Sequence, residues 1–186
     1  MEKRNNGFLA RHAENENFNQ YWYSSHTIEV LVQEISAVSK RAAFLSTPSV
    51  YFSLPKGSAV RDNSYLLDFD QQWAKHPNFV LYDFNAPESL PASLHGSFDC
   101  VVIDPPFITQ EVWQKYASAV HLLLAPQGKI ILSTISENAA VLHKLLGVTP
   151  QRFRPSIPNL VYQYNFFANY ETQFLCETNI EVPDDD

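Results

Sequence analysis

Five short apolar segments, separated by stretches with helical or turn character, constrain the fold of this chain more than any other feature. They cover residues 42–47, 65–70, 79–83, 98–104 and 129–134. Their apolar residues follow one another without the alternation that marks a strand with one wet face, which is typical of strands covered on both faces. The segments therefore predict a mostly parallel sheet with helices on both sides.

Helical patterns occur between these segments. A first helix is expected to begin at Ser24 or Ser25, either of which can cap it. Its buried face would consist of Ile28, Leu31, Val32, Ile35 and Val38, which recur at helical spacing. A further helix is expected after a cap at Thr109. Another is expected over residues 136–146, between a capping serine and Gly147.

The end of the chain predicts an antiparallel pair of strands. Residues 148–153 and 160–170 are joined by only a Pro-containing turn, as in a hairpin. With this ending, the alternation of strands and helices predicts a three-layer α/β sandwich. We expect one domain over residues 20–178, with a polar N-terminal tail of residues 1–19 and an acidic C-terminal tail of residues 179–186.

Charge bears on the kind of partner. The chain carries 13 Lys and Arg against 20 Asp and Glu, a net charge of −7, and its basic residues are scattered. Proteins that hold nucleic acid by its phosphates usually concentrate basic residues in a patch. A basic protein is therefore the expected partner, and nucleic acid is not.

Other sequence features bear on cellular location and on metals. No apolar run approaches the roughly 18 residues that cross a bilayer, and the first residues lack the apolar segment of a signal peptide. Neither the two cysteines nor the histidines show the spacing of metal ligands. These features predict a cytoplasmic protein without a membrane segment or a metal site.

Acidic residues stand at the ends of three consecutive predicted strands: Asp68 or Asp70, then Asp83, then Asp104. Ligands of an open parallel sheet bind beyond the carboxyl ends of its strands. One acidic strand end is ordinary, because Asp favours turns, but three in succession indicate a site. An acid after the second strand suits ribose hydroxyls, and Asp83 with Phe84 suits a place beside an adenine ring.

The sharpest motif is Asp104-Pro105-Pro106-Phe107. The two prolines end the strand and fix the backbone, because they donate no hydrogen bond and lock φ. The Asp104 carboxylate and the Pro105 carbonyl are acceptors, and Phe107 adds an apolar face. Such a group can hold an amine by its hydrogens and aim the nitrogen lone pair at an electrophilic methyl group. The alternative interpretation is a structural Asp-Pro-Pro turn with a buried Phe.

This tetrapeptide resembles the catalytic motif of amino-group methyltransferases. A wider resemblance to one family rests on an ordered set of segments at residues 20–24, 47–51, 68–70, 82–85 and 97–107, and runs from about Phe18 to Tyr170. That family was first labelled N6-adenine methyltransferase-like, and its studied members methylate a lysine of translation elongation factor 1-alpha.

The resemblance implies a class I, Rossmann-like methyltransferase fold with a seven-stranded sheet and S-adenosylmethionine as cofactor. It places Trp22, Tyr23 and Ser24 near the methionine end of the cofactor. It places Thr47, Pro48 and Ser49 in the cofactor-binding loop after the first strand. It places Asp68 or Asp70 at the ribose and Asp83 and Phe84 at the adenine. Asp104 is placed beside both the cofactor and the target amine. The catalytic residues it implies are Asp104, Pro105, Pro106 and Phe107.

The chain departs from common patterns at two points. Its first-strand loop, residues 47–49, has no Gly-x-Gly for close backbone approach to a cofactor. Phe107 stands where Tyr is commoner, so no mechanism should require a hydroxyl there. The predicted function is methylation of a protein lysine, with elongation factor 1-alpha as the substrate. The alternatives are a DNA or RNA adenine-N6 methyltransferase, with Phe107 stacking on a flipped base, and a cofactor-binding scaffold without activity.

Overall fold

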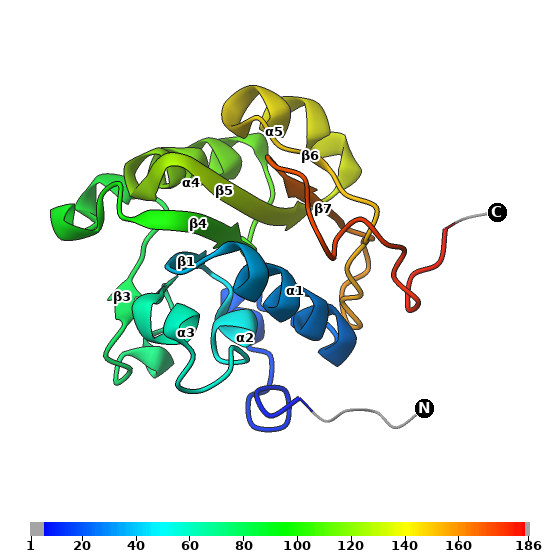
Figure 1. Cartoon of the computed structure of the whole chain (residues 1–186), viewed down its shortest axis with the longest axis horizontal. Helices are drawn as coiled ribbons and strands as arrows, with labels where there is room; N and C mark the ends of the chain where they lie inside the picture. Colours follow the sequence, from blue (N-terminus) through cyan, green and yellow to red (C-terminus); the bar gives the residue numbers. More distant parts are fainter. Residues whose placement is uncertain (1–5, 185–186) are drawn as a thin grey trace.

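A computed structural model describes residues 6–184, and its strands form one seven-stranded sheet (Figure 1). In chain order the strands are β1 (Ala42–Leu45), β2 (Tyr65–Asp68), β3 (Phe79–Leu81), β4 (Phe98–Ile103), β5 (Leu124–Thr134), β6 (Thr149–Pro150) and β7 (Asn165–Ala168). Their order in the sheet is β3-β2-β1-β4-β5-β7-β6. The first five strands are parallel, and β7 is antiparallel to both β5 and β6. The predicted sheet with an antiparallel end is confirmed.

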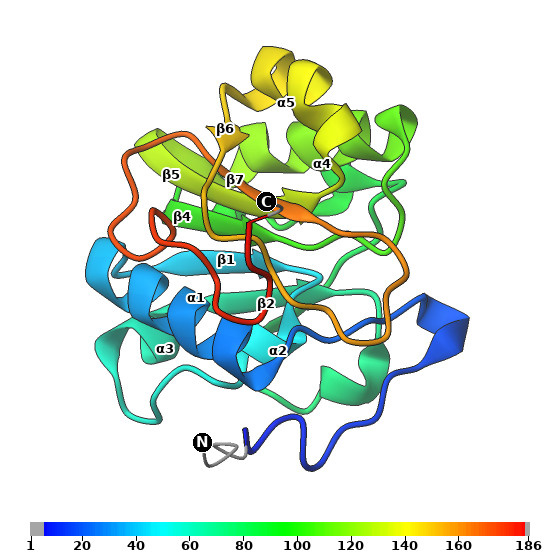
Figure 2. The ribbon, with the colours of Figure 1, turned by 90° about the vertical axis from the view of Figure 1, so that its right-hand side faces the viewer.

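Helices cover both faces of the sheet (Figures 1 and 2). On one face lie α1 (Ser25–Val38), α2 (Pro48–Tyr51) and α3 (Ala59–Asn63), and on the other lie α4 (Gln110–Leu123) and α5 (Ala139–Leu146). Apolar side chains fill the space between each helix layer and the sheet. The three-layer α/β sandwich is therefore confirmed.

The residues of β1 show why the strands lack polar alternation. Ala42 and Phe44 point into the core beneath α1 and α2, whereas Ala43 and Leu45 point into the core beneath α4 and α5. All four are buried. Because successive side chains of a strand point to opposite faces, a strand between two helix layers must be apolar at every position.

Local capping chemistry sets most helix ends. The Ser24 side chain accepts a hydrogen bond from the Thr27 backbone N–H at the start of α1, and Thr109 caps α4 in the same way. Gly147 ends α5 with a φ of 67°, a left-handed conformation that favours glycine. The expected start of α5 is wrong, because residues 136–138 form a 3-10 turn and the α-helix begins at Ala139.

The N-terminal segment differs from the predicted solvated tail over the residues that the structure describes, whereas residues 180–184 at the other end are mostly exposed. Phe8 is only 3% exposed and packs against Trp22, Phe52 and Trp73. Residues 6–19 therefore belong to the packed domain, because one aromatic ring anchors a segment that is otherwise polar. At the other end Asn179 is buried, and its side chain donates to the Arg154 carbonyl at 2.8 Å. Residues 1–5 and 185–186 of the predicted tails lie outside the described part.

The terminal hairpin is shorter than its sequence pattern. Only Thr149–Pro150 and Asn165–Ala168 pair, and residues 160–164 form no strand. They lie at the carboxyl-end side of the sheet instead, where Leu160 and Tyr164 line a pocket. No helix within residues 6–184 is long and apolar enough to span a bilayer.

Candidate active site

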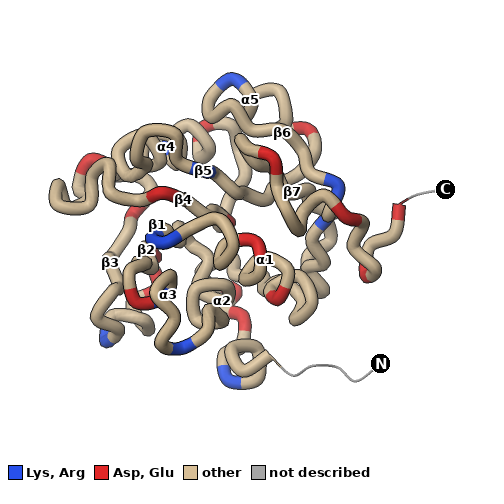
Figure 3. Tube along the Cα trace, viewed as in Figure 1, with Lys and Arg blue, Asp and Glu red and all other residues tan. Residues whose placement is uncertain are grey.

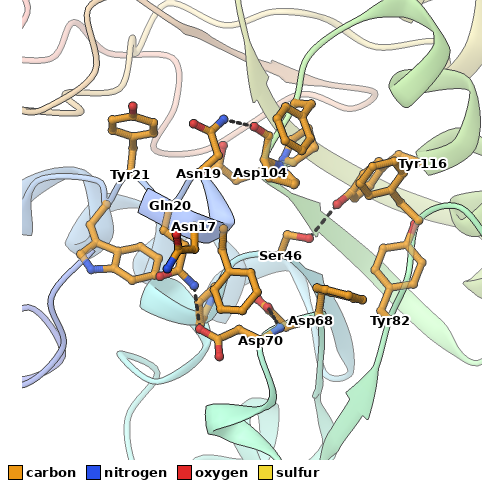
Figure 4. Close-up of a pocket in the computed structure, with 18 of the residues that line it drawn as sticks. Asn17, Asn19, Gln20, Tyr21, Ser46, Asp68, Asp70, Tyr82, Asp104 and Tyr116 are labelled. Carbon is orange, nitrogen blue, oxygen red and sulfur yellow. Dashed lines mark hydrogen bonds between the residues drawn. The ribbon is translucent and has the colours of Figure 1, made fainter. Parts of the chain in front are cut away.

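A pocket of about 380 Å³ lies at the carboxyl ends of β1, β2, β3 and β4 (Figure 4). Ten of the residues predicted from the sequence line it: Trp22, Pro48, Asp68, Asp70, Asp83, Phe84, Asp104, Pro105, Pro106 and Phe107. They come from separate segments between residues 22 and 107. The parallel sheet collects them because the carboxyl ends of its strands meet at one edge.

Four other predicted cofactor residues do not line this pocket: Tyr23, Ser24, Thr47 and Ser49. Tyr23 and Ser24 line a neighbouring groove, which shares Trp22 with the pocket. Thr47 and Ser49 are buried at the start of α2. Direct cofactor contacts for these four residues stay a prediction.

Asp104 follows β4, and its side chain is hydrogen-bonded to a residue of the neighbouring strand β5. Its Oδ1 accepts a hydrogen bond from the Ser133 hydroxyl at 3.0 Å, and Ser133 Oγ lies 2.5 Å from the hydroxyl of Tyr23. Burial raises the pKa of the Asp104 carboxyl to about 7, against the opposing effect of the Ser133 and Tyr23 hydrogen bonds. The carboxyl is thus poised to change its charge near neutral pH.

The prolines that follow Asp104 form a rigid loop at the pocket wall. The side-chain amide of Asn19 donates a hydrogen bond to the carbonyl of Pro106. Phe107 is 52% exposed, with its ring 6.5 Å from that of Phe84. The alternative interpretation of the motif, a turn with a buried Phe, is therefore wrong. The ring stands at the mouth, where it can meet a ligand.

The structure distinguishes the two acids at the carboxyl end of β2, Asp68 and Asp70. Asp70 accepts hydrogen bonds from the side chains of Gln20 and Gln72 and from the Gln72 backbone N–H, which it caps. Asp68 Oδ1 accepts from the Asp70 backbone N–H at 2.8 Å. Burial raises the Asp68 pKa to about 7, although backbone N–H groups oppose the rise. Asp70 is occupied by its own turn, so Asp68 has the greater capacity to accept hydrogen bonds from a ligand.

Aromatic rings form the wall near the end of β3. Phe84 stacks on Tyr116 with ring centroids 5.8 Å apart, and Tyr82 meets Tyr116 edge-on at 5.5 Å. The Tyr116 hydroxyl pairs with Ser46 Oγ at 2.7 Å (Figure 4). Asp83 Oδ1 accepts a hydrogen bond from the Asn85 backbone N–H at 2.8 Å. This wall offers flat apolar surface beside a few polar atoms, which suits a heteroaromatic ring.

Sequence reasoning missed several residues of the pocket, including Asn19, Gln20, Ser46 and Tyr116. Asn19 and Ser46 both adopt a left-handed backbone, with φ of 51° and 59°. Local sequence does not reveal these conformations, apart from the general tolerance of Asn for them. Tyr116 is buried on α4, and a helical pattern of apolar residues does not show where the hydroxyl of a buried Tyr lies.

A comparison with protein families decides the identity. The sequence profile of the family described as "Probable N6-adenine methyltransferase" matches residues 14–172 of this chain. The chain belongs to this family. Its predicted membership, made from the Asp104–Phe107 motif and the segments around it, is confirmed.

Curated relatives match over most of their length. Human "EEF1A lysine methyltransferase 1" is 36% identical over 172 residues, which are 88% of this chain and 78% of the human protein. The zebrafish protein of the same name is 36% identical over 168 residues, 84% of this chain and 98% of its own length. These names do not favour the adenine alternative.

A solved structure supports the fold of this methyltransferase. The N1-methyltransferase of 1,6-didemethyltoxoflavin from Burkholderia thailandensis, crystallised with S-adenosylhomocysteine, superimposes with a TM-score of 0.53 and 14% identity. The match covers 77% of this chain and 76% of that one. The predicted class I fold is confirmed, and the chain is an S-adenosylmethionine-dependent N-methyltransferase.

The pocket of the methyltransferase fits such a cofactor. Tyr82 lines the pocket, and its buried hydroxyl has no hydrogen-bond partner among residues 6–184. A buried polar group without a partner is costly, so this hydroxyl is a candidate to pair with a polar ligand. Asp68 adds acceptors, and the Phe84–Tyr116 wall adds apolar surface. No group of three or more His, Cys, Asp or Glu in the described part of the chain could hold a metal ion.

Proposed function

We propose that this methyltransferase modifies the ε-amino group of a lysine in translation elongation factor 1-alpha, with S-adenosylmethionine as the methyl donor. The observation that carries the proposal is the position of Asp104 in the pocket, next to a rigid diproline loop and an exposed Phe107 ring. The two named relatives, each 36% identical, support this factor as the substrate. The cofactor would supply an electrophilic methyl group.

The pocket residues suit a lysine target for electrostatic reasons. A lysine ammonium has a pKa near 10.4 and no lone pair until it loses a proton. An ionised Asp104 would attract the ammonium and then accept a hydrogen bond from the neutral amine. The carbonyl of Pro105 offers a second acceptor, and Phe107 gives the aliphatic side chain an apolar wall. Positioning of this kind supplies much of the rate of a group transfer.

We assign the cofactor contacts from the same geometry. Asp68 is proposed to accept hydrogen bonds from the ribose hydroxyls, with Asp70 stabilising the turn that follows it. Phe84 is proposed to lie against the adenine, next to Asp83. Trp22 would close the opposite wall, where its indole N–H donates to the His12 carbonyl at 3.1 Å. That bond ties the wall to the packed N-terminal segment.

Surface charge also supports a protein substrate. In the view of Figure 3, the Lys and Arg residues of the described part of the chain are dispersed along the trace and form no strip that could follow a phosphate backbone. The net charge is −7. Nucleic acid binding depends on neutralising phosphates, so this surface favours a basic protein. We propose that the enzyme acts in the cytoplasm, where elongation factor meets ribosomes, and that its catalytic domain includes residues 6–19 as well as residues 20–178.

A direct transfer assay tests the proposal. The purified protein would be incubated with tritium-labelled S-adenosylmethionine and purified elongation factor 1-alpha, and in parallel with DNA and RNA. Label on the factor, located to a lysine by mass spectrometry and formed at least about tenfold more slowly by an Asp104→Ala variant, would support the function. Label on nucleic acid alone would establish the adenine alternative, and no label on any substrate would contradict the proposal.

A further inference from the structure

Behind the pocket lies a buried chain of hydrogen bonds that starts at Asp104. Ser133, in β5, approaches Asp104 Oδ1 at 3.0 Å, and Tyr23, just before α1, approaches Ser133 Oγ at 2.5 Å. Ser133 is 0% exposed and Tyr23 is 2% exposed. The three residues come from different parts of the chain, so only the fold brings them together.

The direction of this chain follows from the chemistry of its groups. An ionised carboxylate only accepts, so the single proton of Ser133 points to Asp104. Ser133 Oγ must then accept, and the Tyr23 hydroxyl is its donor. Burial, and next the charge of Asp104, raise the pKa of Tyr23 well above its ordinary value, so Tyr23 keeps its proton. The hydrogen bonds therefore run from Tyr23 to Ser133 and from Ser133 to Asp104, and Tyr23 is also close enough to Asp104 to lower the pKa of its carboxyl.

We propose that Ser133 and Tyr23 are positioning residues for methyl transfer, which hold Asp104 by Oδ1 and leave Oδ2 to accept a hydrogen bond from the substrate amine. The inference rests on the proposed function, because it assigns the amine to Asp104. A carboxylate held by one oxygen cannot rotate freely, so its second oxygen keeps a fixed direction.

Other titratable groups near Asp104 do not compete with this assignment. Tyr116, from α4, and Tyr164, before β7, both have a pKa raised first by burial and further by the Asp104 charge, so both stay neutral. Asp68 lines the same pocket, and its pKa of about 7 means that a pH profile of activity alone would mix two carboxyls. Lys115, on α4, does not line the pocket; its Nζ lies 5.8 Å from the centroid of the Phe84 ring and forms an ion pair with Glu111. A decisive test must therefore follow Asp104 itself.

The first measurement compares kcat of Ser133→Ala, Tyr23→Phe and the double variant at saturating cofactor. Loss of the hydrogen bond to a charged group should lower kcat about tenfold or more for Ser133→Ala. Tyr23→Phe should cost less, because Ser133 still donates, and the double variant should be the slowest. Affinity of Ser133→Ala for S-adenosylmethionine should change by less than about threefold, because Ser133 is not among the residues expected at the cofactor.

Matched controls separate positioning from packing. Ser133→Cys keeps the volume but donates weakly, so it should behave like Ala if the hydrogen bond matters and like Ser if only packing matters. Ser39→Ala removes another serine donor to an aspartate, Asp99, and Tyr170→Phe removes another tyrosine hydroxyl, which donates to Glu34. Both controls lie outside the pocket and should keep kcat within about twofold. Melting curves would confirm that each variant folds.

A second measurement works without any activity. Carbon NMR of the Asp104 carboxyl would give its titration midpoint in the wild type, in Ser133→Ala and in Tyr23→Phe. Loss of a donor to the ionised form moves the midpoint to higher pH, and the midpoint of Asp68 should stay in place. A shifted midpoint would support the hydrogen-bonded chain even if neither the wild type nor any variant methylates elongation factor 1-alpha. That combination of results would contradict only the proposed function. If neither the midpoint nor kcat differs from the controls, the inference is overturned.

Discussion

The side-chain amide of Asn19 donates a hydrogen bond to the carbonyl of Pro106, across 87 residues of sequence. Gln20, the next residue, donates to Asp70 Oδ2 at 2.9 Å (Figure 4). Two adjacent side chains therefore connect the N-terminal segment to the diproline loop and to the turn after β2. This segment forms one wall of the pocket and braces two of its other walls, so we expect it to contribute to activity as well as to stability.

Asn19→Gly isolates the contribution of the Asn19 amide. Asn19 has a φ of 51°, which Gly adopts without strain, so the substitution removes the hydrogen bond and keeps the backbone. A neutral hydrogen bond is worth about 0.5 to 1.5 kcal/mol, and kcat/KM should therefore fall by about twofold to tenfold, as measured by steady-state transfer assays. Asn19→Ala should also lower the melting temperature, because Ala resists a positive φ. Equal activity of Asn19→Gly and wild type would show that the hydrogen bond from Asn19 to the Pro106 carbonyl does not contribute to activity.

Asp68, the last residue of β2, and Asp70, just beyond it, should respond differently to substitution. Asp68→Ala removes the proposed ribose acceptor and should weaken S-adenosylmethionine binding about tenfold to a hundredfold, by analogy with other hydrogen bonds to charged groups. Asp70→Ala removes the cap of the next turn and its bonds to Gln20 and Gln72. It should mainly lower the melting temperature, with a smaller effect on binding. Calorimetry on both variants checks this, and the reverse ranking would assign the ribose to Asp70.

The raised carboxyl pKa values predict how stability depends on pH. Asp68 and Asp104 titrate at about 7 in the folded protein, against an ordinary value of 3.8. Between these values the folded state binds more protons than the unfolded state, so stability falls as pH rises from about 4 to 7 and levels off above 7. The slope is at most about 1.4 kcal/mol per pH unit for each group, and less for Asp104, which faces the pocket.

The Asp68 and Asp104 carboxyls should therefore make the melting temperature of the cofactor-free protein higher at pH 5.5 than at pH 8. Asp68→Asn removes one of the titrating groups, and its melting temperature should depend less on pH over that range. Differential scanning calorimetry of both proteins in matched buffers measures the difference. An unchanged pH dependence in Asp68→Asn would show that the Asp68 carboxyl is ionised throughout the range.

Local chemistry explains which features could be predicted from the sequence. The caps at Ser24 and Thr109 and the stop at Gly147 depend on neighbouring residues, and all three were expected. Acids at strand ends were expected to converge because parallel strands share an edge, and Asp68, Asp83 and Asp104 do line one pocket. In these cases the pattern and the consequence lie within a few residues or follow from the topology.

The missed features depend on contacts between distant residues. Phe8 looked like part of a polar tail until the fold placed Trp22, Phe52 and Trp73 around it. Ser133 was only a residue near the end of an apolar strand, and its role beside Asp104 comes from the neighbouring positions of β4 and β5 in the sheet. A single hydroxyl or ring has no period and no motif, so the sequence alone carries no sign of its partner.

Substitutions of Asp104 separate positioning of the amine from a need for negative charge. Asp104→Asn keeps one acceptor oxygen and most of the geometry, whereas Asp104→Ala removes both oxygens and leaves Ser133 without its acceptor. A hydrogen bond to a charged group is worth about 1.5 to 3 kcal/mol, so Ala should slow turnover by roughly tenfold to a hundredfold or more, with Asn intermediate. Turnover should be compared at saturating cofactor, with melting curves for each variant. Near-normal turnover of Ala would remove Asp104 from the mechanism. If Asn were as slow as Ala, the charge itself would be required, and binding of the lysine ammonium by the carboxylate would replace simple orientation of the neutral amine.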